Sequence, residues 1–492
     1  MKLASLLSLV LITAQAATID SPLADAAKRM DHPAIQALLQ HHADVNAPQV
    51  DGSTALHWAA YQEDVETVTL LLKSGANAKA ENRYGVTSLS LACTNGNAKI
   101  VDLLLSAGAN PNTFLPGGET VLMTAARTGK PEAIRALLAR GAEVDAKETK
   151  FGQTALMWAA AEGNVAAVET LVAAKADIKA TSKSGFTAFM FSVREGQIGT
   201  MKALIKAGSS PNEVVKFTGR KPGGVTGPPT ENETALQLAV TNGHYDLASE
   251  LLDAGSDPNS DAAGFTALHC ITHTRKPGVG DNDPAPQGSG NMTSLDLVKK
   301  LVAKGADVNR KMTKKVNFGL TALNTMGATP FFLAAKTSDA ELMKLLASLG
   351  ADPSITNDEG TTPLMAIAGL GTRSPGEDAG TEPEVLEALQ VALDLGNDIN
   401  AVNKNGETAM HSAAYKNHPL AVQFLWDKGA KIEIWNKKNK FGWTPLVIAE
   451  GYRFGNFKPS PDTIAVFRKI MTAAGVPLIV DPPPGKGWQP EP

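Results

Sequence analysis

The sequence predicts an all-α solenoid of about twelve helix–turn–helix repeats joined by finger loops. The first observation is a recurring pattern: Gly, any residue, Thr, then an Ala-rich apolar stretch. The second is its period, because five of the ten spacings between these Thr residues are 33 or 34 residues. The third is composition, because 43% hydrophobic but only 5% aromatic residues suit closely stacked Ala-rich helices. A repeat of this size cannot bury its apolar face alone, so the repeats must stack into one quasi-linear domain. The pattern's Thr lies at positions 54, 87, 120, 154, 187, 234, 266, 329, 362, 408 and 444.

The N-terminus has the features of a cleaved export signal. Lys2 is followed by an apolar run over residues 3–12 and then by Ala14-Gln15-Ala16. The run is shorter than the roughly 20 apolar residues that span a bilayer. A charged start, a short apolar run and a small-residue site are typical of a signal peptide. We therefore expect residues 1–16 to be removed, and the mature chain to be exported to a bacterial periplasm or the extracellular medium.

A single repeat, residues 51–76, illustrates the local signals for two helices. Gly52 permits a tight turn, and Thr54 can cap the helix that follows it. Val65 and Leu72 belong to a set of apolar residues at helical spacing, which predicts a second amphipathic helix. Gly75 then suits the left-handed position that ends a helix. Each repeat is therefore expected to be a turn followed by two short antiparallel helices.

These motifs resemble the ankyrin repeat. The segments Thr54-Ala-Leu-His57, Thr266-Ala-Leu-His269 and Thr408-Ala-Met-His411 are similar to its T-P-L-H-x-A signature. Endings such as Gly305-Ala-Asp-Val-Asn309 are similar to its G-A-D-x-N close. The resemblance covers nearly all of residues 21–475. Some repeats depart from it and leave single hydrogen bonds in doubt: Asn232 replaces the turn Gly, and Ser90, Met123, Met157 and Gln237 replace the signature His.

The repeat register predicts the organisation of the chain. Residues 17–50 form a degenerate capping repeat, 51–212 regular repeats, 213–479 repeats with insertions, and 480–492 a Pro-rich tail. Five insertions interrupt the period, and they are either tolerated surface loops or segments that shape a binding groove. They cover residues 213–231, 275–292, 311–326, 371–382 and 453–461.

The sequence carries little that indicates catalysis. Phosphate-binding, zinc-protease, serine-hydrolase and C-x-x-C-H motifs are all absent from it. Lys and Arg number 46 against 50 Asp and Glu, which argues against a dedicated nucleic-acid or anionic-membrane binder. Cys93 and Cys270 lie five repeats apart, so we expect two buried free thiols. The sequence thus predicts a non-enzymatic protein without a cofactor.

A metal site is the alternative that uses histidine. His269 and His273 are four residues apart on a predicted helix, and Asp281 and Asp283 follow in the next loop. That spacing can place two imidazoles on one metal ion. Against it, His269 occupies the signature position, where the resemblance implies a structural hydrogen bond between repeats. We therefore expect no metal at His269.

The resemblance also implies where a partner would bind. In this family the partner-facing groove is built from finger residues beside the turn and from exposed positions of each first helix. Trp, Tyr and Arg, which dominate protein–protein binding energy, gather at these positions. The chain is thus expected to be a monomeric scaffold that binds another protein of unknown identity, with a secreted effector of host proteins or a plain spacer as alternatives. The predicted partner-binding residues are Trp58, Tyr61, Arg127, Trp158, Phe191 and Arg194 on helices, and Arg83, Tyr84, Phe151 and Phe186 on fingers.

Overall fold

The computed structural model describes residues 21–115, 117–216, 231–277, 285–316, 322–376, 378–453 and 458–478. Its contacts divide the chain into two compact units, Met1–Ala180 and Thr181–Pro492. We call these the N-terminal unit and the C-terminal unit and describe each by itself. Stacked repeats contact only their neighbours, so a solenoid can divide between any two of them. The division falls one repeat before residue 212, where the sequence changes from regular to inserted repeats.

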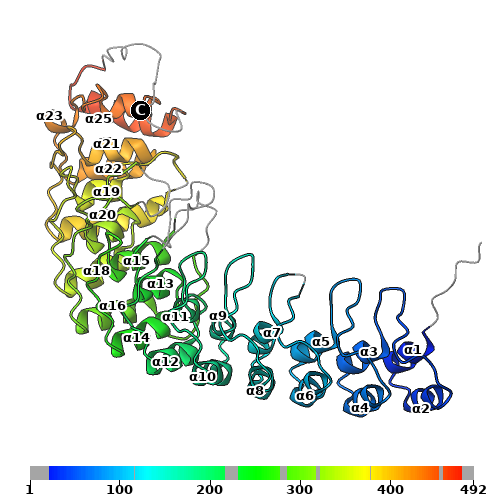
Figure 1. Ribbon diagram of the computed structural model, residues 1–492. Coiled ribbons are helices and arrows are strands. Elements are labelled where there is room, and N and C mark those ends of the chain that lie inside the picture. Colours follow the sequence, from blue (N-terminus) through cyan, green and yellow to red (C-terminus); the bar gives the residue numbers. More distant parts are fainter. Residues whose placement is uncertain are drawn as a thin grey trace, which may run out of the picture. The chain divides into compact units, whose positions relative to one another are not determined.

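The N-terminal unit contains five helix pairs in its described residues. In chain order they are α1 (Pro22–Lys28), α2 (His32–Gln40), α3 (Ala55–Tyr61), α4 (Val65–Lys73), α5 (Ser88–Asn95), α6 (Ala98–Ser106), α7 (Val121–Thr128), α8 (Pro131–Ala139), α9 (Ala155–Ala161) and α10 (Val165–Ala173). Figure 1 shows the first helices of these pairs in one row and the second helices in another, with the finger loops projecting on the side of the first row.

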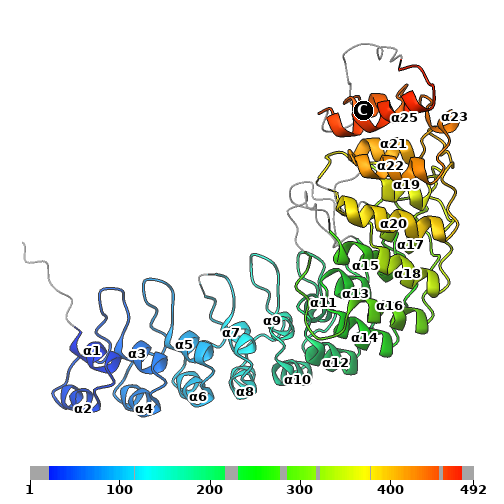
Figure 2. The ribbon, with the colours of Figure 1, turned by 180° about the vertical axis from the view of Figure 1, so that it is seen from behind.

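The C-terminal unit contains seven more pairs among the residues described there. They are α11 (Ala188–Arg194), α12 (Ile198–Lys206), α13 (Ala235–Thr241), α14 (Tyr245–Asp253), α15 (Ala267–Arg275), α16 (Ser294–Ala303), α17 (Pro330–Lys336), α18 (Ala340–Ser348), α19 (Pro363–Ala368), α20 (Glu382–Asp394), α21 (Ala409–Lys416), α22 (Pro419–Asp427), α24 (Pro445–Ala449) and α25 (Pro461–Ala473). A short helix, α23 (Ile432–Trp435), lies in the finger before α24. In this stack α13, α15, α17, α19 and α21 contact one another in turn (Figure 2).

The marker threonines set the helix boundaries. All eleven are the N-cap residues of first helices, as at α3 and α24. In α7, for example, the Thr120 hydroxyl accepts the Met123 amide at 3.2 Å. Such a cap satisfies an amide that the helix itself leaves unpaired. The second helix α4 begins in the same way, because Asp64 accepts the Thr67 amide at 3.0 Å. The twelve expected helix pairs are therefore confirmed.

Repeats are held together by small apolar residues and by asparagine. In the Thr54 repeat, Ala60 and Leu71 are fully buried, and α3 contacts both α1 and α5. The Asn that closes one repeat reaches the next: Asn112 Nδ2 donates to Gly141 O at 3.0 Å. The same bond recurs at other repeats that close with Asn, as at Asn309 Nδ2 and Gly350 O, 3.2 Å apart. The closing motif is thus a repeat-to-repeat tie, which explains its spacing.

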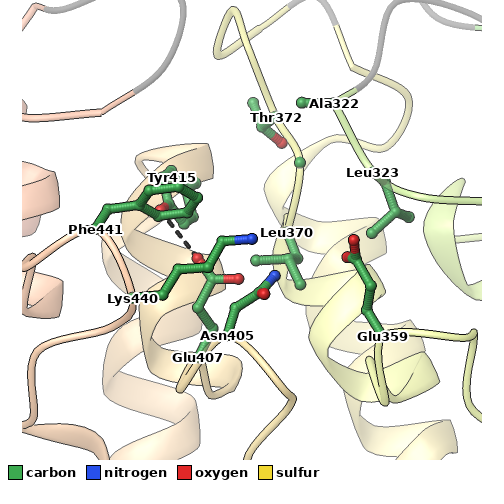
Figure 3. Close-up of a pocket in the computed structure, with 11 residues that line it drawn as sticks. Ala322, Leu323, Glu359, Leu370, Thr372, Asn405, Glu407, Tyr415, Lys440 and Phe441 are labelled. Atoms are coloured by element: carbon green, nitrogen blue, oxygen red, sulfur yellow. Dashed lines mark hydrogen bonds between the residues drawn. The ribbon is translucent and has the colours of Figure 1, made fainter. Parts of the chain in front are cut away.

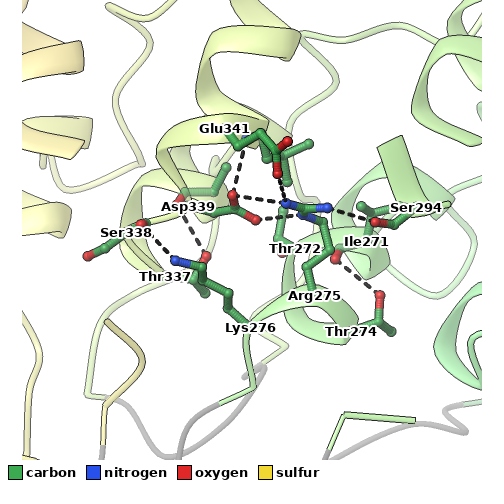
Figure 4. Close-up of polar contacts among 12 residues, drawn as sticks. Ile271, Thr272, Thr274, Arg275, Lys276, Ser294, Thr337, Ser338, Asp339 and Glu341 are labelled. Carbon is green, nitrogen blue, oxygen red and sulfur yellow. Dashed lines mark hydrogen bonds and ion pairs between the residues drawn. The ribbon is translucent and has the colours of Figure 1, made fainter. Parts of the chain in front are cut away.

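Three insertions separate the two helices of a pair, after α15, α19 and α24. The insertion after α15 begins with two anchored cations (Figure 4). Arg275 pairs with Asp339, whose side chain is 1% exposed, at 2.6 Å. The Lys276 ammonium donates to Ser338 O at 3.3 Å and to Glu384 at 2.7 Å, and this bond lowers the pKa of Glu384 to about 2. Lys276 thereby joins the Thr266 repeat to the next two repeats.

The described residues include no helix long and apolar enough to cross a membrane. The predicted signal peptide, residues 1–16, and the Pro-rich tail, residues 480–492, lie outside the described residues. Cys93 and Cys270 are free and buried, as expected, and burial raises the pKa of both thiols.

Candidate functional site

The signature histidines are structural. His57 Nδ1 accepts the Thr54 amide at 3.1 Å, and its Nε2 lies 3.0 Å from Val86 O on the next finger. Because Nδ1 is the acceptor, Nε2 carries the proton and donates to this carbonyl. The equivalent Nε2 contacts of His269 and His411, to Ala328 O and Lys437 O, are 3.2 and 3.1 Å. The histidine therefore fixes the position of the neighbouring finger.

Burial keeps these imidazole rings neutral, and hydrogen bonds engage their nitrogens. Desolvation lowers the pKa of His269 and of His411 to about 4, and it also lowers the pKa of His57. Both nitrogens of His269 are already engaged in hydrogen bonds, so the ring has no free lone pair for a metal ion. The proposed extra ligands Asp281 and Asp283 lie outside the described residues. Among the residues that are described, no three His, Cys, Asp or Glu side chains are grouped as a metal site.

The repeats that lack histidine differ in how well they replace it. Gln237 does so fully: its Oε1 accepts the Thr234 amide at 2.7 Å and its Nε2 donates to Phe265 O on the next finger. Ser90 accepts the Thr87 amide at 3.0 Å but is too short to reach the next finger. The thioether of Met123 lies 3.4 Å from the Thr120 amide and carries no proton to donate.

Trp58 lies at the centre of a cluster on the exposed side of α3. Its indole N–H donates to Gln49 Oε1 at 2.7 Å, and the Tyr61 ring meets it edge-on at 6.0 Å. The ammonium of Lys28, from α1 of the capping repeat, lies 4.5 Å from the ring centroid. Tyr61 is 53% exposed. The cluster thus offers two rings and one cation to a binding partner.

The same arrangement returns three repeats later. Arg127 of α7 lies over the Trp158 ring of α9, 5.6 Å from the guanidinium carbon to the ring centroid. Lys28 lies seven positions after Ser21 and Arg127 seven positions after the marker Thr120. Each cation covers an indole that lies four positions after the next marker Thr. Neither Lys28 nor Arg127 has an ion-pair partner among the described residues. Such cation–π pairs contribute about 0.5–1 kcal/mol at exposed sites and leave the outer face of the cation free.

The fingers add exposed rings to this surface. Tyr84 is 67% exposed and Phe151 is 53% exposed, each three residues before a marker Thr. The neighbouring Arg83 is also exposed, and its amide joins two fingers by donating to Asp51 O at 2.8 Å. Lys150 lies 4.8 Å from the centroid of the Phe151 ring. The tips therefore present aromatic rings beside cations.

Acidic finger residues are used within the turns. Asp51 accepts the Ser53 amide at 2.9 Å, and this bond lowers the pKa of the carboxyl. Glu148 is 4% exposed, and its carboxylate accepts three amides of its own turn, including those of Phe151 at 2.6 Å and Gln153 at 3.0 Å. Backbone N–H groups thus take up these negative charges, while the cations extend outward.

Two of the predicted partner-binding residues are buried, so the prediction that they are exposed to a partner is wrong. Phe186 and Phe191, in the C-terminal unit, are each only 3% exposed, with ring centroids 5.6 Å apart. The residue just before the marker Thr points inward, as Ser53 and Phe265 do at equivalent positions. Arg194 is exposed, as expected, and covers Phe191 at 4.8 Å. In this repeat the rings are therefore covered, and the exposed Arg194 is paired with Glu195 at 2.7 Å.

Two surface residues were not predicted. The first is Lys28. If Ser21 of the capping repeat is aligned with the marker Thr of the other repeats, Lys28 takes the position of Tyr61 and Arg127. This alignment is the signal that would have predicted it. Phe114 is the other, 53% exposed on the finger before α7. Its signal was an aromatic residue within a finger, six positions before a marker Thr.

Comparison with known proteins agrees with this geometry. A family model for ankyrin repeats in three copies matches residues 23–114, 122–215 and 379–456, more than half of the chain. The chain belongs to the ankyrin-repeat family. A model of the single ankyrin repeat also matches residues 231–262 and 326–358. Ankyrin repeats are typically protein-interaction scaffolds rather than catalysts.

Several curated proteins are similar to parts of the chain. The human transient receptor potential cation channel subfamily A member 1 is 31% identical over 128 residues, 26% of this chain and 10% of that protein. Neurogenic locus notch homolog protein 1 of Xenopus tropicalis is 31% identical over 177 residues, 32% of this chain and 6% of that protein. The E3 ubiquitin-protein ligase KEG of Arabidopsis thaliana is 25% identical over 240 residues, 43% of this chain and 12% of the ligase. The chain spans about a tenth of these relatives' lengths.

Among solved structures, the human ASB11 ankyrin repeat domain matches with a TM-score of 0.41 and 23% identity. That match covers 49% of this chain and all of the domain.

Proposed function

We propose that this protein is an exported ankyrin-repeat scaffold that holds a partner protein against the groove of its N-terminal unit. One observation carries the proposal: the cation–indole cluster at Trp58 recurs at Trp158, on one row of helices whose fingers present exposed Tyr84 and Phe151. Aromatic and Arg side chains with part of their surface free are the groups that contribute most when a partner covers them. Packed rings also lose little conformational entropy on binding.

The exposed finger rings give the sharpest test of this groove. Proteins bound to the tagged full-length chain in its native host would be identified by mass spectrometry, then purified and titrated against variants. We expect Tyr84→Ser together with Phe151→Ser to weaken binding about tenfold or more. A matched control is Tyr452→Ser, which changes a 40% exposed ring in the C-terminal unit.

The exposed rings contribute little to folding, so loss of binding by the double variant would not reflect unfolding. Substitution of half-buried Trp58 and Trp158 would combine both effects, so those variants come second. If the double variant and the unaltered chain bind the partner with equal affinity, the proposed binding groove is refuted.

Export is supported by the sequence of residues 1–16 and has its own test. The mature protein is expected to begin at Ala17, which intact-mass measurement of protein from the native host would check. Fractionation then distinguishes a periplasmic scaffold from an effector released into the medium. A chain that retains Met1 inside the cell would refute export and leave the groove proposal standing.

A further inference from the structure

Two insertions of the C-terminal unit meet and enclose a small pocket (Figure 3). The insertion before α17 and the one after α19 are joined by a hydrogen bond of 2.9 Å from Ala322 N to Gly371 O. Gly371 has a φ of +84°, and a Cβ there would lie 2.5 Å from Leu323 N, so the close approach requires glycine. The pocket has a volume of about 130 Å³. A cavity of about 150 Å³ holds benzene, so this pocket has room for one small molecule.

Two side chains of opposite charge reach this pocket from different fingers. Glu359 precedes α19, Lys440 precedes α24, and Asn405 lies on the finger between them. The three fingers are joined by backbone hydrogen bonds, from Lys404 N to Glu359 O at 2.9 Å and from Lys440 N to Asn405 O at 2.8 Å. Figure 3 shows the carboxylate of Glu359 and the ammonium of Lys440 pointing into the pocket from opposite walls.

These two charged ends have no ion-pair partner among the residues that the structure describes. The Lys440 ammonium lies over the Phe441 ring, 4.9 Å from its centroid. The neighbouring fingers fix the backbone on both sides. The pocket therefore presents a carboxylate and an ammonium group without an ion-pair partner, on fingers whose backbones are joined to each other.

The rest of the pocket is preorganised. Glu407, 4% exposed, accepts the Tyr415 hydroxyl at 3.0 Å and Asn439 Nδ2 at 3.1 Å on one oxygen. Its other oxygen accepts only Asn403 Nδ2, at 3.3 Å. Burial raises the pKa of Glu407, while its hydrogen bonds and the charge of nearby Lys440 act in the opposite direction. Leu323 on the first insertion and Leu370, directly before the second, supply apolar surface.

We propose that this pocket binds a small α-amino acid. The ligand ammonium lies beside Glu359, its carboxylate beside Lys440, and its short side chain against Leu323 and Leu370. A zwitterion can pair with Glu359 and Lys440 at the same time. An amine or a carboxylate alone would leave one of these two side chains desolvated without a partner charge. The site goes beyond the proposed scaffold function, because it uses no residue of the N-terminal groove and can succeed or fail independently of it.

Calorimetric titration of the full-length chain tests the proposal with four probes. L-Alanine carries both charges, ethylamine lacks the carboxylate, and propionate lacks the ammonium. At concentrations up to about 10 mM, suited to a weak small ligand, we expect L-alanine to bind and the other two not to bind. L-Tryptophan, which exceeds the pocket in size, should not bind either.

Variants locate the site. Glu359→Gln and Lys440→Gln should each weaken L-alanine binding about tenfold or more, because each removes one charge-assisted hydrogen bond. Lys437→Gln is the control, since this exposed lysine lies on the same finger but outside the pocket. Lys440 is exposed and Glu359 only part-buried, so these variants should fold.

Three results would overturn the proposal. They are no binding of L-alanine, binding of ethylamine or propionate with equal affinity, and equal weakening by the Lys437 variant. None of these outcomes affects the groove of the N-terminal unit.

Discussion

Replacing His269 by glutamine should remove an acid sensitivity of the C-terminal unit without removing the hydrogen bonds that the ring makes. Gln237 shows that glutamine fits this position, because it accepts the marker amide and donates to the next finger. The imidazole of His269 makes the same two contacts, but it can also take up a proton. The substitution therefore separates the effect of charge from that of packing.

The size of the effect follows from the pKa. Burial lowers the pKa of His269 to about 4, below its ordinary value of 6.5. Between these values the unfolded chain binds more protons than the folded one, so stability falls as pH falls. For these two pKa values, the loss between pH 7 and pH 5 is about 2 kcal/mol. The His269→Gln variant should lose none of this stability, because glutamine does not take up a proton in this pH range.

Native-state hydrogen exchange of α15 amides is the assay, with both proteins compared at pH 7 and at pH 5. At pH 5 the unaltered chain should exchange about 30-fold faster than the variant, relative to their ratio at pH 7. His41→Gln, which changes an exposed loop residue of the N-terminal unit, should leave that shift in place. If His269→Gln loses as much protection as the unaltered chain, protonation of this ring is not the cause.

Two further predictions concern the insertions and their anchors. Gly380→Ala should lower the free energy of unfolding by about 2–4 kcal/mol, since φ is +91° and the new Cβ would lie 2.7 Å from the Ser338 hydroxyl. Gly376→Ala has a φ of +90° but no neighbour within 4 Å, so it should lower that free energy by only about 1 kcal/mol. Arg275→Gln should lower the free energy of unfolding by about 3 kcal/mol, because it leaves the buried Asp339 without its ion-pair partner. Arg135→Gln breaks an exposed ion pair and should lower it by less than about 0.5 kcal/mol. Urea unfolding followed by circular dichroism measures both pairs, and equal midpoints within either pair would contradict the prediction.

The helix pairs were predictable because their determinants are local. A marker Thr caps a helix that begins one residue later, and this holds even where insertions stretch the spacing. The insertion boundaries were predictable for the same reason. Whether Gln237 could replace the signature histidine was not, because the answer depends on the distance to a carbonyl on the next finger.

The groove was predictable only in part. Tyr84 and Phe186 both lie on fingers, three residues and one residue before a marker Thr, yet one is 67% exposed and the other 3% exposed. That difference depends on how the finger backbone turns, which composition and spacing do not report. The amino-acid pocket was beyond prediction, since it exists only where Ala322 and Gly371, in separate insertions, come together.

Lys276 has a mechanical consequence. A solenoid whose repeats touch only their neighbours should unravel under tension one repeat at a time. Lys276 instead reaches past the Thr329 repeat to Glu384 in the repeat beyond it. Pulling on the C-terminus should therefore load a contact between non-neighbouring repeats, which adds up to about 1 kcal/mol because both side chains are part-exposed. In a force–extension trace, release of the Thr362 repeat should need more force than release of a repeat without such a contact.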